Sequence, residues 1–174
     1  NADSLLNFPD YRASERAFDL IEQVAGRAGR TAQAQGIVTV QTLQPDNPIF
    51  PFLQTHDYEG FYRHEIEQRR TYHYPPFTRL INIYIKHRDA ATVARIADLY
   101  GVKLRELFGT RVQGPQEPTV ARIQSLYIRR LMLKIETRAS MSKVRAILID
   151  LRNTLAATHP DTRTALTYFD VDPT

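Results

Sequence analysis

The chain has 174 residues, of which 43% are hydrophobic and none is cysteine, and its formal net charge is +4. This length suits one domain, or a small domain with part of another. The lack of cysteine excludes disulfides and thiolate metal sites, and the five histidines show no metal-ligand spacing. No apolar run is long enough to cross a membrane and no signal peptide opens the chain. We therefore expect a cytoplasmic protein with no membrane partner.

The N-terminal third is predicted to combine a helix with a short strand. Residues 1–12 are expected to form a loop, and apolar residues at helical spacing predict a helix from Ala13 to about Ala28. β-branched residues then predict a buried strand over 36–42. A helix followed by such a strand is typical of the closing unit of a parallel α/β sheet, whose remaining strands are absent from this sequence.

Three prolines and a charged helix connect this part to the rest. The prolines, from Pro45 to Pro51, are expected to break regular structure. Residues 57–70 are predicted to form one charged helix, and Pro75-Pro76 marks a domain boundary. The predicted divisions are 1–45 for the end of an α/β lobe, 46–71 for a connecting segment and 72–174 for a C-terminal α+β domain.

Residues 79–174 alternate between strands and helices. The predicted strands cover 80–86, 111–114, 126–137 and 165–171, and the predicted helices cover 90–108 and 141–155. This β-α-β-β-α-β order is the signature of a ferredoxin-like split fold, in which two helices cover one face of an antiparallel sheet. The expected fold class is therefore α/β at the N-terminal end and α+β at the C-terminal end.

The positive charge is concentrated in the same C-terminal part. Residues 72–174 contain 16 basic and nine acidic residues, whereas residues 1–36 and 37–71 carry net charges of −1 and −2. A local positive excess favours nucleic acid or an acidic peptide as a partner. A basic surface that only aids solubility explains the same charge, and the composition does not separate the two.

One face of the predicted sheet combines a tyrosine with cations. Tyr84 and Lys86 on its first strand, and Arg130 and Lys134 on its third, alternate away from apolar residues. The first and third strands of a split fold are central neighbours, so these four side chains should share the face without helices. Such a face suits single-stranded nucleic acid, through stacking and phosphate contacts. Docking against another part of the protein and simple solvation are the alternatives.

The string Gln-Val-Ala-Gly-Arg-Ala-Gly-Arg over residues 23–30 is the most informative motif. On a helix Arg27 and Arg30 lie on one face, with Gln23 one turn earlier on the same side. The result is a cationic patch next to the open backbone of Gly26, which suits a phosphate chain whose charge grows in a transition state. A basic helix end capped by glycine is the simpler alternative.

The chain lacks the other half of a nucleotide-hydrolysing site. It contains no Gly-Lys-Ser or Gly-Lys-Thr loop to cradle phosphates, and no Asp-Glu pair after an apolar strand to hold magnesium. We therefore expect that it does not hydrolyse a nucleotide alone. Its arginines would complete, as arginine fingers, a site built by another part of the polypeptide.

The motif over 23–30 resembles motif VI of superfamily 2 helicases. Three further blocks, at residues 6–16, 74–79 and 170–173, narrow the resemblance. In this order and spacing, the blocks resemble the PriA family of bacterial replication-restart helicases, primosomal protein N-prime, over essentially the whole chain. The resemblance implies the end of a second RecA-like helicase lobe followed by the C-terminal domain of that family.

The family resemblance implies an ATP-dependent enzyme that moves 3′ to 5′ on single-stranded DNA. Gln23, Gly26, Arg27 and Arg30 would face the nucleotide, with the two arginines as catalytic residues. ATP, magnesium and zinc would belong to the full-length protein, so no cofactor is expected in this fragment. The implied partners are forked and single-stranded DNA, single-stranded-DNA-binding protein and other primosome proteins. A stand-alone single-stranded nucleic-acid-binding module without catalysis is the alternative.

Overall fold

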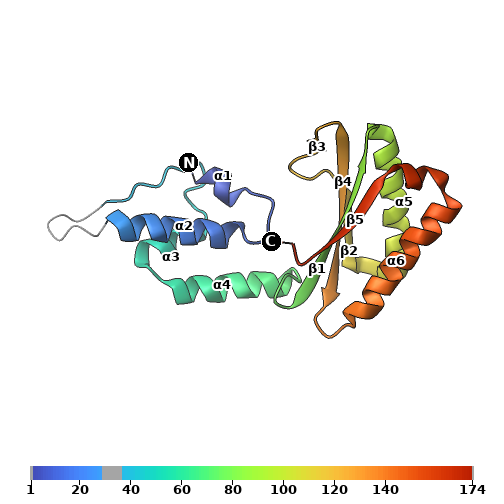
Figure 1. The fold of residues 1–174 in the computed structure, drawn as a ribbon. Coiled ribbons are helices and arrows are strands. Elements are labelled where there is room, and N and C mark those ends of the chain that lie inside the picture. The colour runs from blue at the N-terminus through green and yellow to red at the C-terminus, as the bar shows by residue number, and fades with distance from the viewer. Residues whose placement is uncertain (1, 29–36, 174) are drawn as a thin grey trace. The chain divides into compact units, whose positions relative to one another are not determined.

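The computed structural model describes residues 2–28 and 37–173, and its contacts divide the chain into two compact units, Asn1–Tyr72 and His73–Thr174 (Figure 1). The first unit contains α1 (Asp3–Leu6), α2 (Ala13–Ala28), α3 (Ile49–Thr55) and α4 (Tyr58–Thr71). The second contains β1 (Thr78–His87), α5 (Ala90–Phe108), β2 (Val112–Gln116), β3 (Arg122–Ile123), β4 (Leu126–Glu136), α6 (Met141–Thr158) and β5 (Leu166–Val171), with 3-10 turns at Gly109–Arg111 and Pro160–Thr164. None of the helices described here has the length and apolar character that a membrane span requires.

The second unit confirms the predicted ferredoxin-like topology. Its strands are antiparallel and follow the order β2-β4-β1-β5, so the two predicted central strands, β1 and β4, are neighbours. Helices α5 and α6 cover the same face of this sheet (Figure 1). The short strand β3 was not predicted, and it pairs with the beginning of β4.

The core of this unit lies between the sheet and the two helices. Strand alternation sends Ile83 of β1 and Leu131 of β4 toward the helices, where both are fully buried. The helices contribute an apolar stripe to the same core, with Tyr100 and Leu104 from α5 and Leu155 from α6. The residues that alternate with these on β1 and β4 are therefore placed on the opposite face.

Strand β2 ends at Gln116, two residues beyond its predicted end, because an edge strand tolerates proline. Pro115 lies within β2, at an irregularity of its pairing with β4. The preceding Gly114 has a φ of +90°, and a Cβ there would lie 2.8 Å from the carbonyl oxygen of Arg130. Both its conformation and the close approach of β4 require glycine at this position.

The first unit has a small core of its own. Helix α2 has the predicted bounds, and its Phe18 ring stacks on Phe61 of α4 with the ring centroids 4.2 Å apart. Helix α3 was not predicted, because two prolines precede it and a third lies within it. Pro48 precedes its first residue and Pro51 lies in its first turn, where a helix needs no amide donor.

The predicted strand over 36–42 is wrong for the residues that the structure describes. Residues 37–42 are irregular, and they run beside α1, which forms in a segment predicted to be loop. The amide of Ala2 donates to the carbonyl of Gln41 at 3.0 Å, and Asp3 accepts from the Thr42 hydroxyl at 2.5 Å. A buried strand needs strands on both sides, and the described part of this unit supplies none.

Candidate functional site

The motif residues that the structure describes lie on the last turns of α2. Gln23 and Arg27 are exposed, and their spacing of four residues places them on one side of the helix. Gly26 is also exposed, and a Cβ built on it would meet no atom within 4 Å. Arg30 lies outside the described residues. At this end of α2, the Arg27 guanidinium and the Gly26 backbone are therefore both accessible to a ligand.

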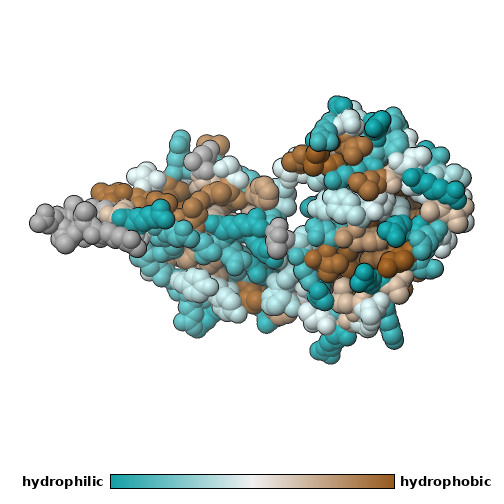
Figure 2. All heavy atoms as spheres, in the orientation of Figure 1, coloured by the Kyte–Doolittle hydropathy of each residue, from teal (hydrophilic) through white to brown (hydrophobic). Residues whose placement is uncertain are grey.

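An apolar strip accompanies the motif on α2. Leu20 and Val24 are separated by about one helical turn, so they lie on the same side of α2. Their exposed fractions are 45% and 48%. The neighbouring segment adds Ile37 and Leu43, which are 88% and 89% exposed. Figure 2 shows hydrophobic side chains along this part of the first unit. Exposed apolar side chains such as Leu20 and Val24, one turn apart on one helix, are typical of a surface that packs against further protein.

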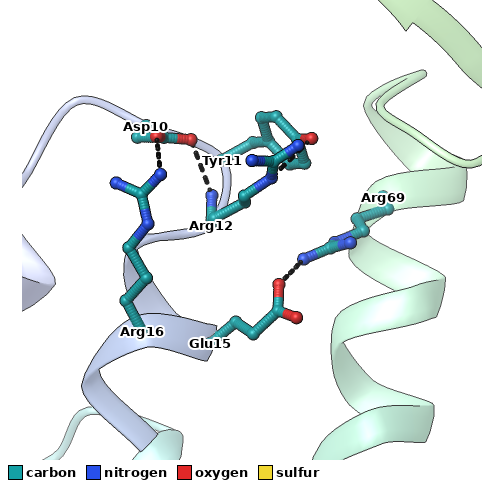
Figure 3. A network of polar contacts seen from close by, with 6 residues as sticks. All are labelled: Asp10, Tyr11, Arg12, Glu15, Arg16 and Arg69. Atoms are coloured by element: carbon teal, nitrogen blue, oxygen red, sulfur yellow. Dashed lines mark hydrogen bonds and ion pairs between the residues drawn. The ribbon is translucent and has the colours of Figure 1, made fainter. Parts of the chain in front are cut away.

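A network of arginines holds the beginning of α2 (Figure 3). Asp10 accepts a hydrogen bond from the Arg12 amide at 3.0 Å and forms an ion pair with Arg16 at 3.1 Å. The Arg12 guanidinium lies 5.0 Å from the centroid of the Tyr11 ring, and its Nε donates to the Tyr11 hydroxyl at 2.8 Å. The network fixes the turn from which α2 starts.

Arg69 of α4 joins the same network from a distant part of the sequence. Its guanidinium lies 5.1 Å from the Tyr11 ring centroid and pairs with Glu15 of α2 (Figure 3). The sequence alone does not predict this contact, because Glu15 and Arg69 are 54 residues apart. A single sequence shows two opposite charges on two predicted helices, and nothing in it says that they meet.

Glu65 lies close to this contact and is half-buried. Burial raises the pKa of Glu65, and the nearby charge of Glu15 adds to that rise, whereas Arg69 and His64 act against it. A raised pKa means that the folded state binds this proton more tightly than the unfolded state does. The stabilisation from protonation is present below the ordinary glutamate pKa and is lost as the pH rises through the folded pKa.

Glu65→Gln is therefore expected to raise the melting temperature of the first unit at pH 7. Glutamine resembles the protonated carboxyl and carries no charge to desolvate, so the advantage should disappear at about pH 4, near the ordinary glutamate pKa. Thermal unfolding followed by circular dichroism between pH 4 and pH 8 measures this difference. Glu67→Gln, on an exposed pair with Arg70, is the control and should show no gain. A lower melting temperature for Glu65→Gln at pH 7 would contradict the expectation.

The helix-free face of the sheet is a second cluster of predicted residues. Tyr84 of β1 lies directly opposite Arg130 of β4, and the register places Lys86 and Lys134 on the same face, as predicted. Tyr168 of β5, which is not among the predicted residues, lies opposite Tyr84 on the side of β1 that faces away from β4. The two tyrosine rings stack with centroids 5.1 Å apart, and the Lys86 amine lies 4.9 Å from the Tyr168 centroid.

Lys134 differs from the other three predicted residues because it is buried. Its amine lies 3.6 Å from the centroid of the Tyr74 ring, and burial lowers the pKa of this lysine. Arg130 is only partly buried, but its Nε is enclosed and has no hydrogen-bond partner among the described residues. The aromatic and cationic groups that this face displays are therefore Tyr84, Lys86 and Tyr168, with the outer part of Arg130.

The comparisons with known proteins agree on one family. The model of the primosomal protein N C-terminal domain matches residues 70–174. The chain is 35% identical to the replication restart protein PriA of Bacillus subtilis, over 82% of this chain and 18% of that protein. It is 37% identical to PriA of Synechocystis over 76% of the chain, and 48% identical to PriA of Chlamydia pneumoniae over 47% of the chain. The chain spans about a fifth of the length of the first of these relatives.

Proposed function

The chain belongs to the family of the primosomal protein N C-terminal domain, and from this membership we propose that it works as the C-terminal part of an ATP-dependent 3′-5′ DNA helicase for replication restart. The observation that carries the proposal is the match to PriA proteins. The match covers most of this chain but less than a fifth of the length of PriA from Bacillus subtilis or Synechocystis. The exposed apolar strip on α2 supports it, because further protein would cover Leu20 and Val24.

In this proposal α2 supplies motif VI to a nucleotide bound elsewhere in the longer protein. The exposed Arg27 guanidinium beside the open backbone of Gly26 fits the phosphates of ATP. Gln23 lies one turn away on the same side, and Arg30 stays a sequence prediction. Magnesium and zinc are proposed to be held by other segments of the longer protein, as the family resemblance implies.

The second unit is proposed to contact forked or single-stranded DNA through its helix-free sheet face. The stacked pair of Tyr84 and Tyr168 offers an aromatic surface to bases, and Lys86 and Arg130 lie beside it to meet phosphates. We also propose single-stranded-DNA-binding protein and other primosome proteins as partners, in the bacterial cytoplasm, on the basis of the family role in replication restart.

Charge reversal on this face tests the DNA contact. The double variant Lys86→Glu/Arg130→Glu is expected to weaken binding of a labelled single-stranded oligonucleotide by about 10- to 100-fold, because two phosphate contacts are lost and two repulsions are gained. Fluorescence anisotropy with the whole 174-residue chain at two salt concentrations measures the affinity and its salt dependence.

The matched control places the same charge change on the helical layer. Lys143→Glu/Arg145→Glu alters two residues at the beginning of α6, away from the sheet face. Equal losses in both double variants would show that net charge alone explains the binding. An absence of binding to the unaltered chain at low salt would exclude the DNA contact and favour a docking face.

The alternative function is a stand-alone single-stranded nucleic-acid-binding module without catalysis. The core of the second unit favours it, because Ile83, Tyr100 and Leu131 belong to a buried cluster made of described residues of that unit. The two functions differ in whether Arg27 takes part in ATP hydrolysis. A DNA-stimulated ATPase assay that compares the longer protein with its Arg27→Ala variant separates the two functions.

A further inference from the structure

Among the described residues, helix α2 contacts α4 through aromatic rings and through an ion pair, and the Phe18 ring also lies 6.1 Å from that of Tyr58. The rings of Phe18 and Phe61 stack nearly parallel, with an angle of 5° between them. The ion pair is that of Arg69 with Glu15, which is set against the Tyr11 ring. Phe61 and Arg69 are eight residues apart on α4, which is about 12 Å along the helix axis. Helix α3 also packs on α2 through Ile49 and Leu53, and His56 pairs with Glu22 at 3.0 Å. The Arg69–Glu15 pair adds a restraint at the beginning of α2, where these contacts do not reach.

The Arg69 side chain is largely buried between α2 and α4. It is only 17% exposed, whereas the Arg63 side chain of the same helix, also paired with a glutamate, is 73% exposed. The guanidinium binds the Glu15 carboxylate (Figure 3), and its carbon lies within cation–π distance of the Tyr11 ring at the same time. A lysine amine can also lie over a tyrosine ring, but it has no planar fork with which to hold the carboxylate and the ring together.

The geometry of α2 amplifies any loosening at this point. Arg27 follows Phe18 by nine residues, which is about 14 Å along the helix. A tilt of about 10° around the aromatic stack would move the Arg27 backbone by about 2 Å. A displacement of about 1 Å at a catalytic group can cost about 10²-fold in rate. Small changes at the beginning of α2 are therefore large changes at its motif end.

We propose that Arg69, through Glu15 and Tyr11, is a positioning residue that sets the orientation of α2 and so aims Arg27 at the nucleotide. The functional part of this inference rests on the proposed helicase function, whereas the structural part does not. Arg69 touches no reacting atom and acts only through α2.

The structural part is tested with spin labels in the 174-residue chain. The chain has no cysteine, so Val24→Cys and Gln68→Cys provide one label on the motif end of α2 and one on α4. Arg69→Gln is expected to broaden the distance distribution between the labels, and Arg63→Gln is expected to leave it unchanged. An unchanged distribution in Arg69→Gln, in a variant that melts like the parent chain, overturns the inference.

The functional part is tested with the longer protein by steady-state ATP hydrolysis in the presence of single-stranded DNA. Arg69→Gln is expected to lower kcat about 10- to 100-fold with the KM for ATP within about twofold, because a misdirected Arg27 weakens the transition state more than ATP binding. Arg69→Lys should recover part of the loss. The kcat of the double variant Glu15→Gln/Arg69→Gln should be no lower than that of the less active single variant, because each change removes the same ion pair.

The outcomes separate this inference from the proposed function. A broadened distance distribution with a normal kcat in Arg69→Gln overturns the positioning role. A normal ATPase rate in Arg27→Ala overturns the proposed role of Arg27 in ATP hydrolysis, whatever Arg69→Gln does. A loss of kcat in Arg27→Ala together with full activity in Arg69→Gln overturns only the inference. If Arg69→Gln fails to fold, Glu15→Gln carries the same test from the other side of the ion pair.

Discussion

Arg27→Ala is expected to lower the DNA-stimulated ATPase rate of the longer protein by about 10³-fold or more, which is the range measured for arginine fingers. The guanidinium would stabilise charge that grows on the phosphoryl group during transfer, so the loss should appear in kcat more than in the KM for ATP. Arg27→Lys keeps the charge and loses the planar fork, and an intermediate rate is expected.

The Arg27 variant also needs a check that folding is unaffected. Arg27 is exposed and contributes no ion pair among the described residues, so its replacement should change the free energy of unfolding by no more than about 0.5 kcal/mol. Thermal melts of the variant and of Arg63→Ala, an exposed arginine of α4, provide the comparison. ATP hydrolysis within tenfold of the unaltered protein would exclude the arginine-finger role.

Phe18→Ala is expected to unfold the first unit while the second stays folded. Phe18 is 2% exposed, it stacks on Phe61, and it belongs to a cluster whose other buried members are Ala17, Ile49 and Leu53. Removing a buried phenylalanine costs about 3–5 kcal/mol, which a core this small cannot absorb. Amide hydrogen exchange of α2 and α4 measures the loss directly.

The same helix provides the control for this variant. Leu20→Ala removes an apolar side chain of similar size from a site that is 45% exposed, and a much smaller effect is expected. Amides of β1 and β4 should remain protected in both variants, because their core is a separate cluster. Wild-type protection of α2 amides in Phe18→Ala would contradict the assignment of Phe18 to the core.

Single elements were predictable where local signals agreed with the packing. The bounds of α5 are those predicted, because an apolar stripe coincides with an N-cap: Asp89 accepts from the amide of Thr92 at 2.7 Å. The shared face of Tyr84 and Arg130 was predictable for a similar reason. Strand alternation and the split topology together place the two residues opposite each other.

Contacts between distant segments decided the rest. Residues 37–42 have the composition of a strand but lack the neighbouring strands that would make one. Lys134 has the spacing of a displayed cation, yet the chain before β1 brings Tyr74 over its amine.

By itself, the sequence determined the family, the ferredoxin-like order of elements and the motif on α2, because each is written in the type and spacing of nearby residues. Only the tertiary structure decided that Arg69 meets Glu15, that Tyr168 stacks on Tyr84, and which predicted cations remain accessible. The physical reason is that pairing across 54 residues depends on how helices and strands pack, and neither charge nor hydropathy along one chain specifies that packing in advance.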